Sequence, residues 1–420
     1  MTLINVISAI GNNNSIAPLL VRDCGLEVPS KIAMTYYQNR SDKYIAHLAA
    51  REKFVDEYST SAVWLGGVPL IGEIANWCIK KLGFNPDINS KLLKEEELQG
   101  LQKNIEKFRD KAPEAVAEME KVAQNVSKYR KALAGKFLAQ TIIPISLIGW
   151  VIPKAVFAWT ASTKAKRQQG MQQTQDTFIA QNKINEKIAN APSFKGVNIG
   201  SLADLSNLEK LIITDTGYAI GRVSTARKRN EAYDLAVRMA GMLYLNYKFP
   251  KQFEKVLNAV SEKLLETNMD LDVKLLADKE FLKAIETDTL ILPKSNNAKD
   301  LLEFVDNNPN SLFTKYANQY EKIKMLNENT RDPRAYVDFK VLGKFRDSIE
   351  NFSKMAKSQN IWEASQQVNQ FAKKAKAVKC ATILTNILTT SSLLALGLPK
   401  FQFIIRELIT GSKLEPGIID

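Results

Sequence analysis

Residues Thr141–Thr160 read TIIPISLIGWVIPKAVFAWT, which is the most apolar stretch of the chain. The 17 residues between Lys136 and Lys154 carry no charge. At about 1.5 Å per residue a helix of this length reaches roughly 25 Å, short of the roughly 30 Å hydrocarbon core of a bilayer. Pro144 and Pro153 each break or kink a helix. The stretch therefore predicts an apolar helical hairpin that enters a membrane, although a span that continues beyond Lys154 stays open.

Two further stretches are comparably apolar. Residues 380–399 read CATILTNILTTSSLLALGLP, which is 20 residues without a charge and long enough to span a bilayer. Residues 61–79 read SAVWLGGVPLIGEIANWCI and are interrupted only by Glu73. The alternative is that all three are buried helices of a soluble bundle. The mean hydropathy of −0.20 is that of a soluble protein and argues against a polytopic transporter.

Basic residues flank both ends of 137–163 and of 380–399, and tryptophans lie within or beside the apolar stretches. Tryptophan favours the headgroup interface, and lysine can extend its ammonium to that interface. Equal basic flanks indicate that both ends stay on the cytoplasmic side, where anionic lipid is attractive. The predicted membrane-contact residues are Trp64, Trp77, Trp150, Lys154, Trp159, Lys164, Lys166, Arg167, Lys379 and Lys400.

Apolar residues recur at helical spacing through much of the chain. Leu98, Leu101, Ile105 and Phe108 follow one another at intervals of three, four and three. The same alternation continues over 119–133 and again over 361–378. Such spacing places apolar side chains on one helix face. We expect a mainly α-helical bundle with long amphipathic helices and apolar helical hairpins.

The chain contains matching segments in the same order. Residues 85–93 read NPDINSKLL and residues 268–276 read NMDLDVKLL. Residues 41–49 also match 230–238. Residues 63–69 (VWLGGVP) match 243–250 (LYLNYKFP), and both of these segments end in proline. We therefore predict two related, duplicated halves that pack about a shared seam. The predicted divisions are 1–163, a polar linker and helix over 164–206, and 207–420 with an insertion near 280–340.

The charge and cysteine content exclude several kinds of site. The net charge of +13 is spread along the chain, and no nucleic-acid-binding motif accompanies it, which argues against nucleic acid as a partner. Cys24, Cys78 and Cys380 lie far apart and form no CxxC pair, so a zinc site and a disulfide framework are not expected. Three isolated cysteines suit a reducing compartment. We expect no cofactor and no metal.

The sequence offers little for catalysis. His47 is the only histidine and lies in a helical pattern, where a surface role is the simplest interpretation. Asp23-Cys24-Gly25 and Asp215-Thr216-Gly217 resemble the paired Asp-x-Gly turns of two-lobed aspartic proteases and of actin-like ATPases. Those folds need extensive β structure, which this chain does not predict. The simpler interpretation of both tripeptides is a turn or a helix cap. Catalysis stays undecided, and a non-enzymatic role is favoured.

These observations predict a non-enzymatic, membrane-associated helical binding or scaffold protein, anchored at the cytoplasmic face by apolar segments with basic flanks. Its expected partners are anionic membrane lipid or a membrane protein, and a homo-oligomer stays open. The alternative is a soluble, cytoplasmic protein–protein interaction module whose apolar segments form its core or a dimer interface.

Overall fold

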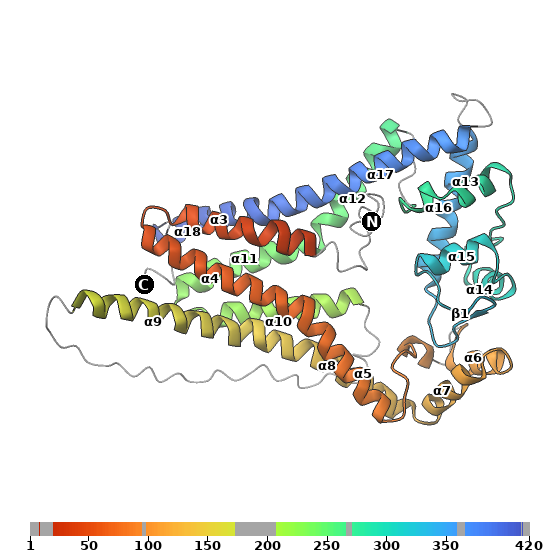
Figure 1. Cartoon of the computed structure of the whole chain (residues 1–420), viewed down its shortest axis with the longest axis horizontal. Coiled ribbons are helices and arrows are strands. Elements are labelled where there is room, and N and C mark those ends of the chain that lie inside the picture. Colours follow the sequence, from red (N-terminus) through yellow and green to blue (C-terminus); the bar gives the residue numbers. More distant parts are fainter. Residues whose placement is uncertain are drawn as a thin grey trace. The chain divides into compact units, whose positions relative to one another are not determined.

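The chain is mainly helical, as predicted (Figure 1). The computed structural model describes residues 8, 20–94, 98–172, 207–265, 271–358, 366–412 and 414. Within these ranges β structure is confined to one antiparallel pair, β1 (Met325–Asn327) and β2 (Thr330–Arg331).

The residues form two compact units, each assembled from separate parts of the chain. Unit 1 comprises Met1–Arg22, Ile74–Leu133 and Tyr244–Ser392, and unit 2 comprises Asp23–Glu73, Ala134–Leu243 and Leu393–Asp420. This division follows packing, whereas the predicted boundaries at 163 and 206 follow repeats in the sequence. The predicted boundaries therefore stay predictions.

Unit 1 contains mostly short helices. Its core lies among α13, α14, α15, α16 and α17 and is rich in aromatic rings, with Phe281, Phe352 and Phe371 fully buried. The ring centroids of Phe281 and Phe352 are 6.1 Å apart, and those of Phe352 and Phe371 are 5.4 Å apart. The elements that contribute to unit 1 are α5 (Val68–Lys81, its later part), η3 (Ser90–Leu93), α6 (Leu101–Phe108), α7 (Pro113–Gln124), α8 (Val126–Ser146, its first part), α12 (Phe249–Leu265), η6 (Leu275–Ala277), α13 (Lys279–Glu286), α14 (Ala298–Asn307), α15 (Leu312–Gln319), α16 (Phe339–Ser358) and α17 (Gln367–Ser392).

The region expected to be an insertion, 280–340, contributes to this core as short capped helices. The side chains of Asp278, Asn297 and Ser311 accept hydrogen bonds from backbone N–H groups in the first turns of α13, α14 and α15. Such caps stabilise a helix by about 1 kcal/mol each because they satisfy donors that the helix itself leaves free. They explain why a segment rich in turn-forming residues nonetheless contains three short helices.

Arg334 joins this core to a second one in unit 1, which forms around α6 and α7. Its guanidinium donates to Glu118 at 2.8 Å and to Asp332 at 2.9 Å, and its carbonyl accepts from the backbone N–H of Asn89. Burial alone would raise the pKa of Asp332. The hydrogen bonds from Arg334, together with its charge and that of Lys324, nevertheless hold the pKa of Asp332 below its usual value.

Unit 2 consists of longer helices interrupted by π-helical turns. Helix α3 packs against α4, and α4 packs against α9. A small apolar cluster around Ile148, Tyr218 and Met239 joins α10 and α11 to the turn η4. The elements that contribute to unit 2 are η1 (Leu20–Glu27, its later part), α3 (Val28–Gln38), α4 (Lys43–Ala62), η2 (Val63–Gly67), the first part of α5, the later part of α8, η4 (Leu147–Val151), α9 (Ile152–Gln172), α10 (Asn207–Ser224), α11 (Arg229–Tyr247), η7 (Leu393–Gly397) and α18 (Leu398–Thr410).

The π turns explain why prolines do not end these helices. A proline lacks an N–H group, and in an α-helix its ring clashes with the carbonyl four residues earlier. A π turn widens the helix locally and relieves both problems. The turns η1, η2, η4 and η7 each end two residues before a proline, namely Pro29, Pro69, Pro153 and Pro399.

The apolar hairpin predicted for Thr141–Thr160 is therefore wrong, because helix continues through both prolines of that stretch. Among the residues that the structure describes, three uninterrupted helical stretches are long and apolar enough to cross a membrane, by length and composition alone. They are Lys43–Lys81, Val126–Lys166 and Gln367–Thr410.

Helix α10 and the turn η4 approach each other closely at two glycines. A Cβ atom added to Gly221 would lie 3.0 Å from the Cα atom of Gly149 and 3.3 Å from the ring of Trp150. The indole N–H of Trp150 also donates to the hydroxyl of Ser224 at 3.0 Å. This contact therefore requires glycine for lack of space rather than for an unusual backbone conformation.

A valine at this contact should destabilise unit 2. We expect Gly221→Val to reduce the free energy of unfolding by about 1–3 kcal/mol, because the branched side chain must displace helix backbone. Gly135→Val is the matched control, since no atom lies within 4 Å of a Cβ built there. Thermal unfolding of both variants measures the difference. Equal stability of the two would contradict the close approach.

Candidate functional site

Twelve charged side chains lie close together inside unit 2. They come from η1, α3, α4, α10, α11 and α18 and from the segment between α10 and α11. Their side chains are between 1% and 24% exposed. Six are acidic and six are basic, and each has an oppositely charged partner among the others. We call this set the charge cluster: Glu27, Lys31, Glu52, Lys53, Asp56, Glu57, Arg222, Arg227, Glu231, Asp234, Arg238 and Arg406.

Glu57 on α4 is shared by three cations. Its carboxylate lies 2.9 Å from the ammonium of Lys53 and 3.6 Å from that of Lys31, and it accepts from the guanidinium of Arg238. Lys31 also pairs with Glu27 one turn earlier. A buried carboxylate without partners would cost several kcal/mol, so this arrangement joins α3, α4 and α11 through one residue.

Asp234 on α11 is held by α18. Arg406 donates to its two oxygens from Nε at 3.0 Å and from Nη2 at 2.8 Å, and Gln402 donates at 2.6 Å. Such a two-point contact fixes direction as well as distance. Only 1% of the Arg406 side chain is exposed, so the pair lies away from solvent.

Two further pairs complete the cluster. Arg222 on α10 donates to Asp56 at 2.7 Å. Arg227 contacts Glu231 at 2.7 Å and Glu52 at 3.3 Å, and its guanidinium lies 4.1 Å from the ring centre of Phe157. These contacts bring α4, α9, α10 and α11 together around charged groups rather than around an apolar core.

Two small adjoining cavities lie within the cluster. The larger, about 40 Å³, is lined by Asp56, Arg222 and Arg227 among others, and the smaller is about 20 Å³. Lys53 and Arg238 line both. Among the side chains that the structure describes, Nε and Nη1 of Arg222 and Oδ1 of Asp56 have no hydrogen-bond partner. Cavities of this size admit a water molecule or a small ion.

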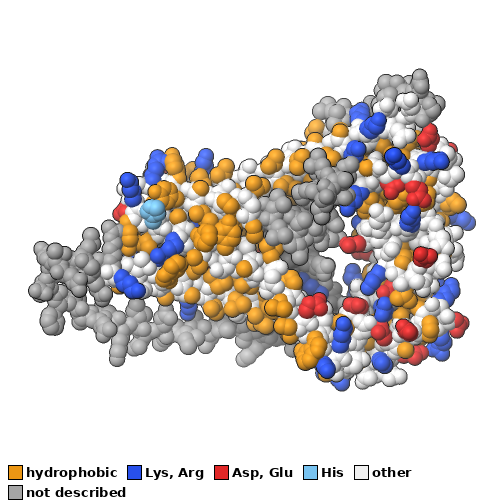
Figure 2. Space-filling model, in the orientation of Figure 1, with side chains coloured by type: hydrophobic (Ala, Val, Ile, Leu, Met, Phe, Trp, Pro, Cys, Tyr) orange, Lys and Arg blue, Asp and Glu red, His pale blue; other side chains and the backbone are white. Residues whose placement is uncertain are grey.

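The outer faces of the same helices are apolar. Phe54 follows Lys53, Tyr233 precedes Asp234, and Ile404 lies between Gln402 and Arg406; all three are exposed. Apolar side chains are likewise prominent on the face of α3, α4, α9 and α18 in view (Figure 2). Unit 2 therefore has charged groups inside and apolar groups outside, the reverse of an ordinary soluble domain.

Sequence reasoning missed the cluster because charged helix positions normally face solvent. A signal was available, since its charged residues recur four apart at 52 and 56, 53 and 57, 227 and 231, and 234 and 238. Apolar residues lie within two of these intervals, Phe54 and Val55 between positions 52 and 56 and Leu235, Ala236 and Val237 between positions 234 and 238. A charged face opposite an apolar one does not by itself say which of the two is buried.

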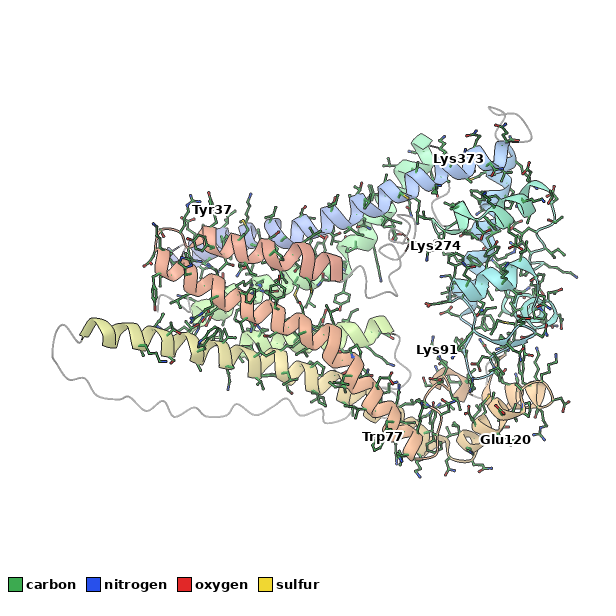
Figure 3. The ribbon with its side chains drawn as sticks, in the orientation of Figure 1. Tyr37, Trp77, Lys91, Glu120, Lys274 and Lys373 are labelled. Atoms are coloured by element: carbon green, nitrogen blue, oxygen red, sulfur yellow. The ribbon has the colours of Figure 1, made fainter. Side chains whose placement is uncertain are left out.

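The predicted membrane-contact residues fall in both units. Trp159 is 46% exposed and stacks on the guanidinium of Arg51 at 4.0 Å. Trp64 and Trp150 are half-buried in unit 2. Also in unit 2, Lys164 is half-buried, and the exposed lysines are Lys154, Lys166 and Lys400. In unit 1, Trp77 (Figure 3) is 61% exposed and Lys379 is half-buried. The side chain of Arg167 lies outside the described residues.

The residues considered for catalysis are placed as follows. His47 is exposed, and its ring meets Tyr36 edge-on with 5.2 Å between centroids. Asp215 is in the interior of α10, so the predicted turn or cap is wrong there. Gly217 instead lets Ile145 approach, because a Cβ at this position would overlap the Cδ1 atom of Ile145. The side chain of Asp23 lies outside the described residues. No cluster of three or more His, Cys, Asp or Glu suited to a metal occurs within the described ranges.

Comparison of the chain with protein families, with characterised proteins and with solved structures found no match.

Removing one member of the Asp234–Arg406 pair should be costly. We expect Asp234→Leu to reduce the free energy of unfolding by about 3–5 kcal/mol, because Arg406 stays buried with its charge. The double variant Asp234→Leu/Arg406→Met should recover most of this loss. Chemical unfolding of the single and double variants checks it. A double variant as unstable as the single one would show that the pair itself is not the cause.

Proposed function

We propose that this chain is a non-enzymatic binding or scaffold protein whose unit 2 is embedded at the cytoplasmic face of a membrane. Unit 1 would then supply a folded domain outside the hydrocarbon. The single observation that carries the proposal is the reversed distribution of side chains in unit 2, where charges are enclosed and large apolar residues face outward.

The outward apolar residues lie on the same helical turns as the charge cluster. On α18, Phe401, Ile404 and Leu408 are exposed, and Leu408 is 77% exposed, while Gln402 and Arg406 are buried. Large exposed apolar surfaces mark contact with a membrane or with another protein. Their recurrence on α4, α9, α11 and α18 favours a surrounding apolar medium over one local partner.

Enclosed ion pairs fit that medium. Charged side chains within a bilayer face the bundle interior and pair with one another, because an unpaired charge in hydrocarbon is costly. Small residues at close helix contacts, such as Gly149 with Gly221, are also typical of membrane bundles. Among the described residues three helical stretches have sufficient length and apolarity to cross, and unit 2 contains residues 43–73, 134–166 and 393–410 of them.

The flanking residues support attachment at an anionic surface. Lys154, Lys166 and Lys400 are exposed beside apolar segments. The stacked pair of Arg51 and Trp159 offers an aromatic ring and a cation together, which suits the headgroup level. Cys24, Cys78 and Cys380 are free thiols, which agrees with a cytoplasmic setting.

The part of unit 1 that is formed by α6, α7 and α13 to α16 has a charged surface. Lysines, arginines and carboxylates are interspersed over α6, α7 and α13 to α16 (Figure 2). Its aromatic core around Phe281 and Phe352 is buried in the usual way. We therefore assign partner binding to unit 1 and anchoring to unit 2.

Membrane fractionation with an alkaline carbonate wash tests the anchoring. We expect the chain to pellet with membranes and to resist the wash, because the outer face of unit 2 lies in hydrocarbon. Leu408→Glu should increase the extracted fraction, since a carboxylate on that face opposes insertion.

Ile291→Glu is the matched control, because Ile291 is 67% exposed in unit 1 and should tolerate the same change. Protein in the supernatant before any wash would refute the anchoring. The apolar face would then be assigned to a soluble protein partner or to a second copy of the chain.

We further propose that the chain arose by duplication. Element order supports this: α3, α4 with α5, η3, and α8 with α9 are followed by α10, α11 with α12, η6, and α17 with α18. The matched segments also share a local hydrogen bond, since Asn89 accepts from the N–H of Lys91 and Asp272 from that of Lys274. Figure 3 marks these two lysines.

Contacts in unit 2 have the reciprocity of a twofold arrangement. Helix α3 packs against η7, and its counterpart α10 packs against η4. When the helices are aligned on Pro69 and Pro250, Glu57 and Arg238 occupy the same position, 181 residues apart, and they form an ion pair. A residue that meets its own counterpart is expected at a twofold axis. The match predicted between 41–49 and 230–238 falls in another register and adds no support.

Comparison of the two halves in relatives tests the duplication. Sequence profiles built separately for 21–172 and 207–410 should align with Pro69 opposite Pro250 and 85–93 opposite 268–276. Profiles of shuffled halves serve as the control. Profiles that align no better than these would refute the duplication.

A further inference from the structure

The smaller cavity of unit 2 has an unusual lining. Lys31, Lys53, Arg238 and Arg406 contribute to its wall, and they come from α3, α4, α11 and α18. No carboxylate lines it among the described residues. The carboxylates that pair with these cations, such as Glu57 and Asp234, lie outside this wall.

Four cations facing one small space create a positive potential within it. The ion pairs of these four cations involve only three carboxylates, Glu27, Glu57 and Asp234, so the group keeps an excess of one positive charge beside the cavity. Burial strengthens the effect, because the side chains of Lys31 and Arg406 are only 7% and 1% exposed and solvent screens them little. A negative charge in the cavity would be strongly favoured.

The adjoining larger cavity offers further donors. Arg222 is buried, and its Nε and Nη1 have no partner among the described residues, although Nη2 donates to Asp56. Lys53, Arg238 and Thr35 line both cavities. A buried guanidinium without full hydrogen bonding indicates bound water or an ion at this position.

Size restricts the ligand. A cavity of about 20 Å³ accommodates a particle similar to one water molecule. Phosphate, nucleotides and lipid headgroups are too large for it. We propose that unit 2 binds one small monovalent anion, of the chloride class, between Lys31, Lys53, Arg238 and Arg406, with water on Arg222 and Asp56 in the adjoining cavity.

Such an anion would hold four helices together. A ligand that binds only the folded state raises stability in proportion to the logarithm of its concentration above its dissociation constant. The inference does not rest on the proposed membrane role, because the site lies inside unit 2 and can be examined in detergent. Failure of one proposal therefore leaves the other standing.

The line width of the ³⁵Cl nuclear resonance, measured with the purified full chain in mild detergent, tests the site. We expect saturable broadening by chloride that bromide relieves and phosphate does not. Lys53→Met should weaken chloride binding at least about tenfold, because one of the four charges is lost. Glu57 keeps Lys31 and Arg238 in that variant, so unit 2 should still fold.

Two variants and a second measurement complete the test. Lys53→Arg should retain binding, and Lys43→Gln, which removes an exposed charge of unit 2, should not change it. At constant ionic strength, the midpoint temperature of thermal unfolding should rise when chloride replaces gluconate. This increase should be absent in Lys53→Met. Absence of saturable broadening, equal broadening in Lys53→Met, or equal competition by phosphate would overturn the proposal.

Discussion

The organisation of unit 2 depends on the cost of enclosing ionised side chains. Glu57 can stay buried only because Lys31, Lys53 and Arg238 reach it from three helices, and Asp234 only because Arg406 and Gln402 reach it from a fourth. These contacts are directional, unlike apolar packing, and they specify which helices are neighbours. Buried ion pairs add little net stability compared with apolar packing, so their role here is to specify an arrangement.

Unit 1, in contrast, is held together mainly by apolar packing. Most of its helices are short and individually weak, and its stability comes from an aromatic core and from capped helix ends. Arg334 adds one polar junction, where it contacts Asp332, Glu118 and Asn89. The two units thus use different physical solutions within one chain, which is consistent with two different surroundings.

Much of the helical content could be predicted from residue spacing. Leu101, Ile105 and Phe108 are buried on one face of α6, as their intervals indicate. The hairpin at Thr141–Thr160 was wrong, because a rule about proline in α-helices does not anticipate a π turn just before Pro153. The charge cluster was missed because Asp56 and Asp234 resemble solvated positions until their partners, Arg222 and Arg406, which are 166 and 172 residues away, are known. The four-residue recurrence of charges indicates a charged helix face, but it does not indicate that partners on distant helices enclose that face.

The π turns also act on helix faces. One inserted residue rotates everything beyond it by about 100°, because an α-helix has 3.6 residues per turn. In Lys43–Lys81, Glu52 and Asp56 lie on one side of the helix before η2. Residues that continue the same spacing after η2 therefore lie on a different side. Each long helix behaves as two segments with independently oriented faces, joined without a loop. A single continuous helix can thus present carboxylates to a neighbour at one end and a mainly apolar face at the other.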